Sequence, residues 1–256
     1  MLHRRPYRET SMLVEVFTEQ HGRVGLVARG ARGPKSRMRG LLEPFSRVLI
    51  SWSGRGDLVT LTRLENAEPA RVLSGEALVS ALYLNEIVLK FCERRDPHPE
   101  LYQAYAETLA RLSAAEQIEI PLRIFEKRLL EAVGYGLELR ETADTHQPVI
   151  AEQRYLYRLD LGPVTDTVVP GESDGPELGT AQRVSISGQS LLALQRESLT
   201  DPTVLRECKR LLRSALNAHL GHRTINARSL FRSSRTSAPT GEQTSDEADE
   251  RLPGSE

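Results

Sequence analysis

Residues 45–64 read FSRVLISWSGRGDLVTLTRL, and this stretch decides the fold class expected for the first quarter of the chain. Its two halves, 45–52 and 57–64, are rich in β-branched and aromatic residues. Between them lies a short loop, Ser53-Gly54-Arg55-Gly56. Two apolar runs joined by a short glycine-containing loop predict a β-hairpin.

Upstream of this hairpin, residues 12–18 (MLVEVFT) and 24–29 (VGLVAR) predict two further strands joined by a turn. Four or five short strands within residues 2–64, with no long helix among them, predict a small β-barrel. An OB-fold is the barrel of this size that most often holds single-stranded nucleic acid, and an SH3-like barrel is the structural alternative.

The segment 22–40, GRVGLVARGARGPKSRMRG, begins as a strand and then becomes strongly basic without a single acidic residue. Two glycines and Pro34 interrupt any regular element, so the sequence predicts a flexible cationic loop. Lys and Arg on such a loop suit contacts with the phosphates of a nucleic acid, and the alternative is a loop that is merely solvated. The predicted contact residues are Arg29, Arg32, Lys35, Arg37 and Arg39.

Charge is distributed unevenly, although the net charge is only −1. Residues 1–63 contain twelve Lys/Arg and five Asp/Glu, a net charge of +7. Segment 205–235 contains eight basic residues and one acid, Glu207, and predicts a second positive surface. Residues 236–256 contain six acids and one base, and their low apolar content predicts a disordered acidic tail beginning at about residue 233.

Beyond Pro69 the apolar period becomes helical. Helices are predicted at 76–94, 100–112, 121–133, 189–196 and 202–221, and two short strands at 154–161 and 164–169. Asp201 or Thr200 is suited to cap the last helix, with Pro202 in its first turn. The predicted architecture is therefore α+β: an OB-fold domain at 1–70, a mainly helical domain at 71–232 with a polar, strand-containing insertion at about 137–180, and the tail.

No pattern of catalytic or metal-binding residues stands out. Residues 30–36, GARGPKS, lack the glycine before Lys35 that a phosphate-binding P-loop needs, because Pro34 stands there. His219 and His222 form only a pair, and the two cysteines, Cys92 and Cys208, are too few for a closed zinc site. The sequence therefore predicts a protein with no catalytic centre, cofactor or metal.

Four aromatic residues lie in the predicted barrel. Phe17 and Phe45 are predicted to pack in the core, whereas Tyr7 and Trp52 are equally suited to packing and to stacking on bases. No signal peptide and no apolar run of membrane-spanning length is visible, so a cytoplasmic location is expected.

Several motifs, in order, resemble the RecO family of bacterial DNA repair proteins. The first part of the chain carries HRRPYRETS at 3–11, GRV at 22–24, GAR at 30–32, SR at 36–37 and LEPF at 42–45. Later come YLNE at 83–86, LRIFE at 122–126, GYG at 134–136, HLG at 219–221 and ARSLF at 227–231. Ala227 replaces the serine usual in the last motif. Many members have a four-cysteine zinc site, but residues 136–157 contain no cysteine, so zinc is not carried over.

The resemblance implies an N-terminal OB-fold and a helical domain that bind single- and double-stranded DNA and anneal complementary strands. It implies cooperation with RecR in loading RecA onto DNA coated by single-strand-binding protein (SSB). Arg228 and Arg232 are expected to assist the basic loop. The family's basic position in the groove for the acidic SSB tail falls on Arg123, and Lys127 and Arg128 are the further candidates for this site. The alternatives are an RNA-processing or RNA-modifying enzyme that uses the barrel as a clamp, and a structural scaffold.

Overall fold

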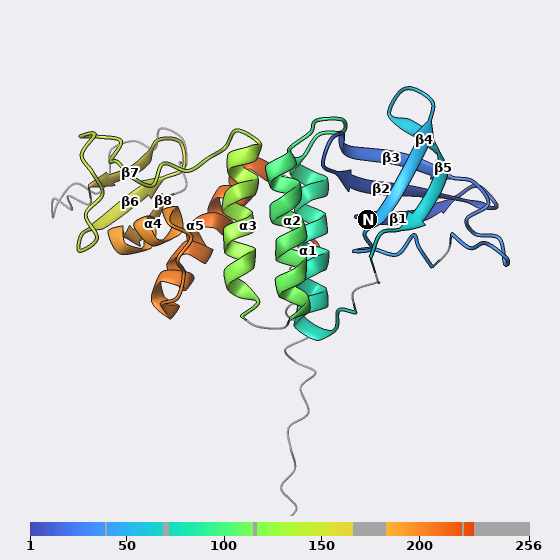
Figure 1. Ribbon diagram of the computed structural model, residues 1–256. Helices are drawn as coiled ribbons and strands as arrows, with labels where there is room; N and C mark the ends of the chain where they lie inside the picture. Colours follow the sequence, from blue (N-terminus) through green and yellow to red (C-terminus); the bar gives the residue numbers. More distant parts are fainter. Residues whose placement is uncertain (39, 69–71, 115–116, 166–182, 222, 228–256) are drawn as a thin grey trace, which may run out of the picture.

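A computed structural model describes residues 1–38, 40–68, 72–114, 117–165, 183–221 and 223–227. The molecule is elongated (Figure 1), with a five-stranded sheet at one end, three side-by-side helices in the middle and a small sheet with two further helices at the other end. A strand-rich, OB-like N-terminal region followed by a helical region confirms the predicted α+β fold class.

The N-terminal sheet has the strand order β1-β2-β3-β5-β4, so that β1 and β4 form its edges. Strands β3 and β5 pair in parallel, and the other pairs are antiparallel. The alternation of apolar residues places Val14, Leu26 and Val59 on the buried face. The strands are β1 (His3–Tyr7), β2 (Ser11–Thr18), β3 (Gly22–Ala28), β4 (Val48–Ser53) and β5 (Leu58–Asn66).

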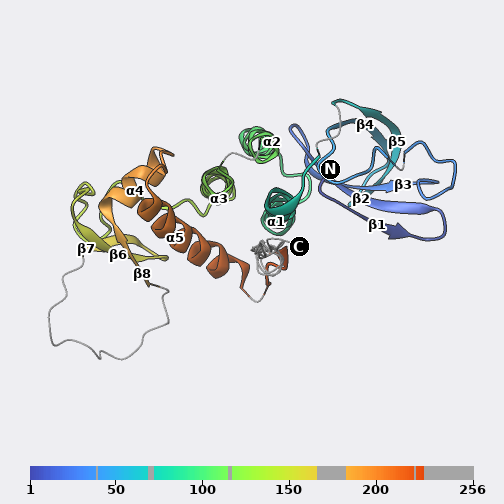
Figure 2. The same ribbon diagram turned by 90° about the horizontal axis from the view of Figure 1, so that it is seen from below.

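The central layer consists of α1 (Gly75–Phe91), α2 (Pro99–Ser113) and α3 (Glu119–Ala132). Seen end-on in Figure 2, α3 lies between α2 and α5 (Pro202–Leu220), and it packs against both helices. Apolar residues at helical spacing fill the core of this layer, among them Leu84, Phe125 and Leu129, each completely buried. Because α3 has neighbours on two sides, residues away from its main apolar stripe are buried as well.

Aromatic residues join the N-terminal sheet to the helices. The Phe17 ring lies edge-on to Tyr102 and Tyr105 of α2, with ring centroids 5.7 and 5.9 Å apart. Phe17 and Phe45 are buried, which confirms their predicted core role. They nevertheless belong to the core of the helices rather than to that of the sheet.

A basic side chain from β3 fixes the sheet to the end of α1. Arg23 Nη1 donates hydrogen bonds to the carbonyl oxygens of Leu89 (2.6 Å) and Cys92 (2.7 Å). A cation is favourable there because the last carbonyls of a helix have no partner within the helix. The carboxylate of Glu15 forms ion pairs with Arg23 and with Arg94, which follows α1.

The far end of the molecule holds an antiparallel sheet of β6 (Arg154–Arg158), β7 (Gly162–Thr165) and β8 (Arg183–Ser187), in the order β7-β6-β8. Both predicted strands are present: β6 ends three residues earlier than expected, and β7 begins two residues earlier, while its predicted end at 166–169 lies outside the described residues. Strand β8 was not predicted. Helices α4 (Gly188–Gln195) and α5 follow it. The predicted cap of α5 is confirmed, because Asp201 accepts hydrogen bonds from the backbone N–H groups of Thr203 and Val204.

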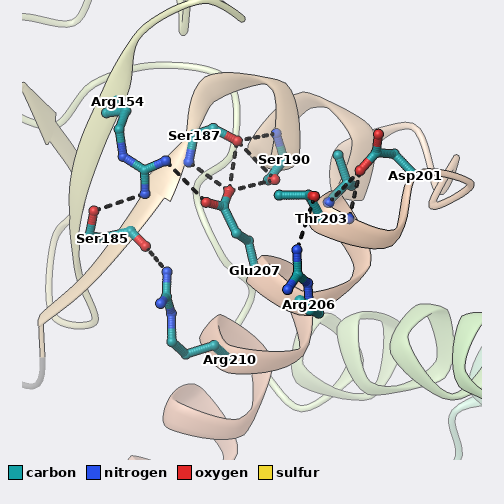
Figure 3. Close-up of polar contacts among 10 residues, drawn as sticks. Arg154, Ser185, Ser187, Ser190, Asp201, Thr203, Arg206, Glu207 and Arg210 are labelled. Carbon is teal, nitrogen blue, oxygen red and sulfur yellow. Dashed lines mark hydrogen bonds and ion pairs between the residues drawn. The ribbon is translucent and has the colours of Figure 1, made fainter.

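Glu207 of α5 organises the junction between β6, β8 and α4 (Figure 3). Its Oε2 accepts hydrogen bonds from the backbone N–H of Ser187 (2.9 Å) and from the hydroxyls of Ser187 and Ser190 (both 2.7 Å). Its Oε1 accepts one from Arg154 Nη1 at 3.2 Å. Partial burial raises the pKa of Glu207, but these hydrogen bonds outweigh burial and lower the pKa from 4.5 to about 2.

We expect Glu207 to make stability depend on pH in the acid range. Since its pKa is lower in the folded chain than in the unfolded chain, its stabilising effect is complete above about 4.5 and is lost as the pH falls toward 2. The difference in melting temperature between the parent and Glu207→Gln should therefore shrink over this range. Other acidic groups titrate in both proteins, so their effects cancel in this difference. A difference in melting temperature that stayed constant from about pH 6 to pH 2 would therefore contradict the lowered pKa of Glu207.

Candidate nucleic-acid interface

The chain between β3 and β4 is held to the N-terminal sheet at several points. Ala31 and Leu42 are buried in the core of the sheet. The backbone N–H of Arg32 donates to the carbonyl of Thr10 at 2.9 Å, and that of Gly33 to the carbonyl of Gly30 at 3.1 Å. The segment is thus a series of turns fixed to the sheet, rather than the freely flexible loop that its glycines and proline indicated.

Between these anchor points the basic side chains point to solvent. Arg29, Arg32, Lys35 and Arg37 are exposed. Arg32 Nη1 donates to the carbonyl of Arg8 at 3.0 Å, which brings it toward the β1–β2 turn. Arg39, the fifth predicted contact, lies outside the described residues. Exposed guanidinium and ammonium groups on one short segment of chain are suited to hold successive phosphates of a nucleic acid.

A surface cavity of about 390 Å³ adjoins this loop, and sequence reasoning did not identify it. Pro6, Met12 and Ala31 provide apolar lining, and Arg4 and Arg32 complete it. Arg4 Nη2 forms an ion pair with Glu43 Oε2 at 2.6 Å. Such a combination can take the flat face of a base or sugar while cations contact the adjoining phosphates. The signal available in the sequence was the basic segment 3–8, but its relation to the loop depends on the pairing of β1 with β2.

Trp52 and Tyr7 are the two aromatic residues for which the sequence allows both core packing and base stacking. Trp52 is half-buried against the core of the sheet, and its ring lies edge-on to that of His21 at a centroid distance of 5.2 Å. Tyr7 is also half-buried, and the guanidinium carbon of Arg8 lies 5.1 Å from its ring centroid. Tyr7 therefore lies beside Arg8, whose carbonyl oxygen accepts from Arg32 of the basic loop, whereas Trp52 packs against its own sheet.

Within the described residues, the second predicted basic surface lies mainly on α5, whereas the first lies on the chain that follows β3. Arg206, Arg210 and Arg213 are exposed on α5, on the opposite side of the helical layer from the N-terminal sheet (Figure 1). Arg228 and Arg232, predicted to assist the loop, lie outside the described residues.

Arg123 and Lys127, the residues predicted to bind the SSB tail, are largely buried in the structure. Arg123 is only 7% exposed, and its Nη1 lies 3.0 Å from Oε2 of Glu126, which is 1% exposed. Lys127 is buried as well and forms ion pairs with Glu131 and Glu197. The physical reason is that α3 is packed between α2 and α5, so Arg123 and Lys127 are largely buried and are paired with carboxylates of the same chain.

The cavity beside this face, about 400 Å³ in volume, is predominantly acidic. Four of its lining residues are glutamates (Glu100, Glu107, Glu131 and Glu197). Its one lining base, Arg128, donates hydrogen bonds to both carboxylate oxygens of Glu197, at 3.0 and 2.6 Å. An acidic peptide entering this cavity would meet like charge, which disfavours binding there.

Within the described ranges, no group of three or more His, Cys, Asp or Glu side chains is placed to bind a metal ion. Burial raises the pKa values of the Cys92 and Cys208 thiols to about 12, so neither resembles a reactive thiolate. His219 stacks on Tyr135 at 3.8 Å, and His222 lies outside the described residues. None of the helices that the structure describes is both long and apolar enough to cross a membrane.

Comparison with known proteins identifies the family. The family model "Recombination protein O N terminal" matches residues 1–70, and "Recombination protein O C terminal" matches residues 73–228. The DNA repair protein RecO of Nitrosococcus oceani is 47% identical over 231 residues, which cover 90% of each chain. That of Alkalilimnicola ehrlichii is 46% identical over 233 residues, covering 91% of this chain and 88% of the relative. That of Coxiella burnetii is 43% identical over 231 residues, covering 90% and 95%.

Proposed function

The chain belongs to the RecO family of DNA repair proteins, and from this premise we propose that it binds single- and double-stranded DNA and anneals complementary strands. With RecR, it would then help to load RecA onto DNA coated by SSB. The observation that supports DNA binding most directly is the row of exposed cations at 29–37 beside an OB-like sheet. A role in DNA repair follows from the family itself.

The basic loop and its cavity supply the contacts that single-stranded DNA needs. Phosphates would lie along Arg29, Arg32, Lys35 and Arg37, with Arg39 included by its position in the sequence. The cavity lined by Met12 and Arg32 would receive a nucleotide. Contacts of this kind are independent of base sequence, because they address the backbone and the flat face of any base. A protein that anneals arbitrary complementary strands requires that lack of sequence preference.

Replacing Arg32 and Lys35 together with Ala should weaken the binding of single-stranded DNA and reduce its dependence on salt. Each lost phosphate contact lowers the slope of log K against log salt by roughly 0.7 on a single strand. Fluorescence anisotropy of a labelled oligothymidylate over a series of salt concentrations measures both quantities. The matched control is Arg111→Ala with Arg196→Ala, which removes two positive charges from the helical part of the chain. An unchanged slope in the loop variant would exclude the loop from the interface.

We propose no catalytic centre. The second candidate class, an RNA-processing or RNA-modifying enzyme, would be distinguished by turnover. Incubation of the pure protein with labelled RNA and with nucleotides should leave both unchanged.

RecR, SSB and RecA remain proposed partners, and binding of the SSB tail is proposed without the site on Arg123 and Lys127. We further propose the division into domains at about residue 70, and a cytoplasmic, nucleoid-associated location.

A further inference from the structure

Three arginines line a third cavity, at the end of the molecule opposite the basic loop. The cavity has a volume of about 290 Å³ and is lined by Arg154, Thr203, Arg206, Glu207 and Arg210. Arg154 comes from β6, and the other four come from α5 (Figure 3). Since Arg206 and Arg210 are four residues apart on one helix, they share its face.

Each of these arginines is held in place by a protein oxygen. Arg154 Nη2 donates to the hydroxyl of Ser185 at 3.1 Å, while Nη1 binds the Glu207 carboxylate. Arg210 donates to the carbonyl of Ser185, and Arg206 Nη2 donates to the Thr203 hydroxyl at 3.2 Å. Arg154 is thus matched by one carboxylate, whereas the oxygens that hold Arg206 and Arg210 are neutral.

The lining residues, three arginines and one glutamate, therefore carry a net charge of +2. The carboxylate of Glu207 accepts hydrogen bonds from Ser187, Ser190 and Arg154, so it holds Arg154 in place at the cavity. A ligand that fits such a cavity must be an anion with several acceptor oxygens, because planar guanidinium groups donate two parallel hydrogen bonds to such groups.

We propose that Arg154, Arg206 and Arg210 form a second DNA site, which binds backbone phosphates of a strand other than the one held by the N-terminal loop. This inference rests on the proposed DNA-binding function and goes beyond it by assigning a separate site to the second strand. Annealing brings two strands together. The basic loop follows β3 of the N-terminal sheet, whereas the cavity is lined from β6 and α5, and these elements lie toward opposite ends of the elongated molecule (Figures 1 and 2).

The lining of the cavity favours a nucleic-acid backbone over an acidic peptide. A peptide site of that kind needs an apolar floor for its hydrophobic side chains as well as a cation for its carboxylate. All five lining residues are polar or charged. Phosphodiester groups require no apolar contact, and their binding is governed by charge and by hydrogen-bond geometry.

The test is a bridging assay with the full-length chain. Oligothymidylate is immobilised on beads, the protein is added, and capture of a second, fluorescent oligothymidylate is measured; the two strands cannot pair with each other. In Arg206→Ala/Arg210→Ala, capture of the second strand should fall about tenfold, and its salt slope should fall by roughly 1.4 for two lost contacts. Binding of the protein to the first strand should change less than about threefold, because the N-terminal contacts remain.

The control Arg111→Ala/Lys209→Ala removes two exposed charges, one of them from α5, without altering the cavity lining, and it should bridge like the parent. Equal bridging by the cavity variant and the parent would overturn the second site while leaving the proposed function intact. Parent protein that binds no single strand at all would overturn the proposed function itself. Loss of affinity for an SSB tail peptide in the cavity variant, with bridging unchanged, would reassign the cavity to an acidic peptide.

Discussion

Replacing Arg123 with Ala should destabilise the folded chain by about 3–5 kcal/mol, the usual cost of removing one member of a buried ion pair. Arg123 Nη1 lies 3.0 Å from a carboxylate oxygen of Glu126, and both side chains are buried. The Tyr83 hydroxyl also donates to Glu126, so the pair belongs to a polar network between α1 and α3. Chemical denaturation of the parent and the variant measures the difference.

A second variant separates loss of charge from loss of fold. In Arg123→Met/Glu126→Gln, both charges are removed while the volume is nearly kept, and the amide oxygen introduced by Glu126→Gln can still accept from Tyr83. Replacement of a buried ion pair by well-packed neutral residues is often tolerated, so most of the lost stability should return. The double variant also removes the charge of Arg123 from a protein that is expected to stay folded. It can therefore test whether Arg123 contributes to binding of the SSB tail. A double variant as unstable as Arg123→Ala would show that the pair itself is not the cause.

Gly22→Ala should have an effect of similar size, by a different mechanism. A Cβ at this position would lie 2.0 Å from the carbonyl oxygen of Asp96, a contact that requires the backbone to move. The backbone at Gly22 also has φ of 61°, a conformation that disfavours any side chain. We expect a loss of about 3 kcal/mol or more, since overpacking and backbone strain add. Thermal unfolding followed by circular dichroism measures it.

Gly30→Ala is the matched control for this prediction. Gly30 has φ of 69°, but a Cβ there would meet no other atom within 4 Å. Its variant should therefore lose only the cost of the left-handed backbone, about 1 kcal/mol. If Gly22→Ala were no more destabilising than Gly30→Ala, the close approach of β3 to the segment after α1 would not be present in solution.

Local patterns predicted most of the secondary structure, because their causes lie within a few residues. The expected helix at 76–94 is found at Gly75–Phe91, and the expected cap Asp201 begins α5. Strand β8 escaped prediction because its five residues follow a long polar segment, and its strand character comes from pairing with β6. Its buried residues, Val184 and Ile186, complete a core that distant segments supply.

Some functional residues could be predicted from the sequence, whereas others depend on contacts between distant segments. Charge along the chain was enough to identify exposed cations at 29–37, because no acid lies near them in the sequence. The cavity beside them depends on Arg4, which only the β1–β2 hairpin brings to Arg32. Similarly, Arg154 and Arg206 are far apart in the chain and line one cavity only because β6 pairs with β8, which packs against α5.

The sequence by itself determined the class of fold, the positions of most elements, the family and the uneven distribution of charge. Each of these depends on residue type and on spacing over short distances. Only the tertiary structure decided which charges remain available to a ligand. Arg123 and Arg206 are both helical arginines, yet α3 lies between two helices while the Arg206 face of α5 is open. Burial of a charge depends on which elements pack around it, and that arrangement is set by contacts between residues far apart in the chain.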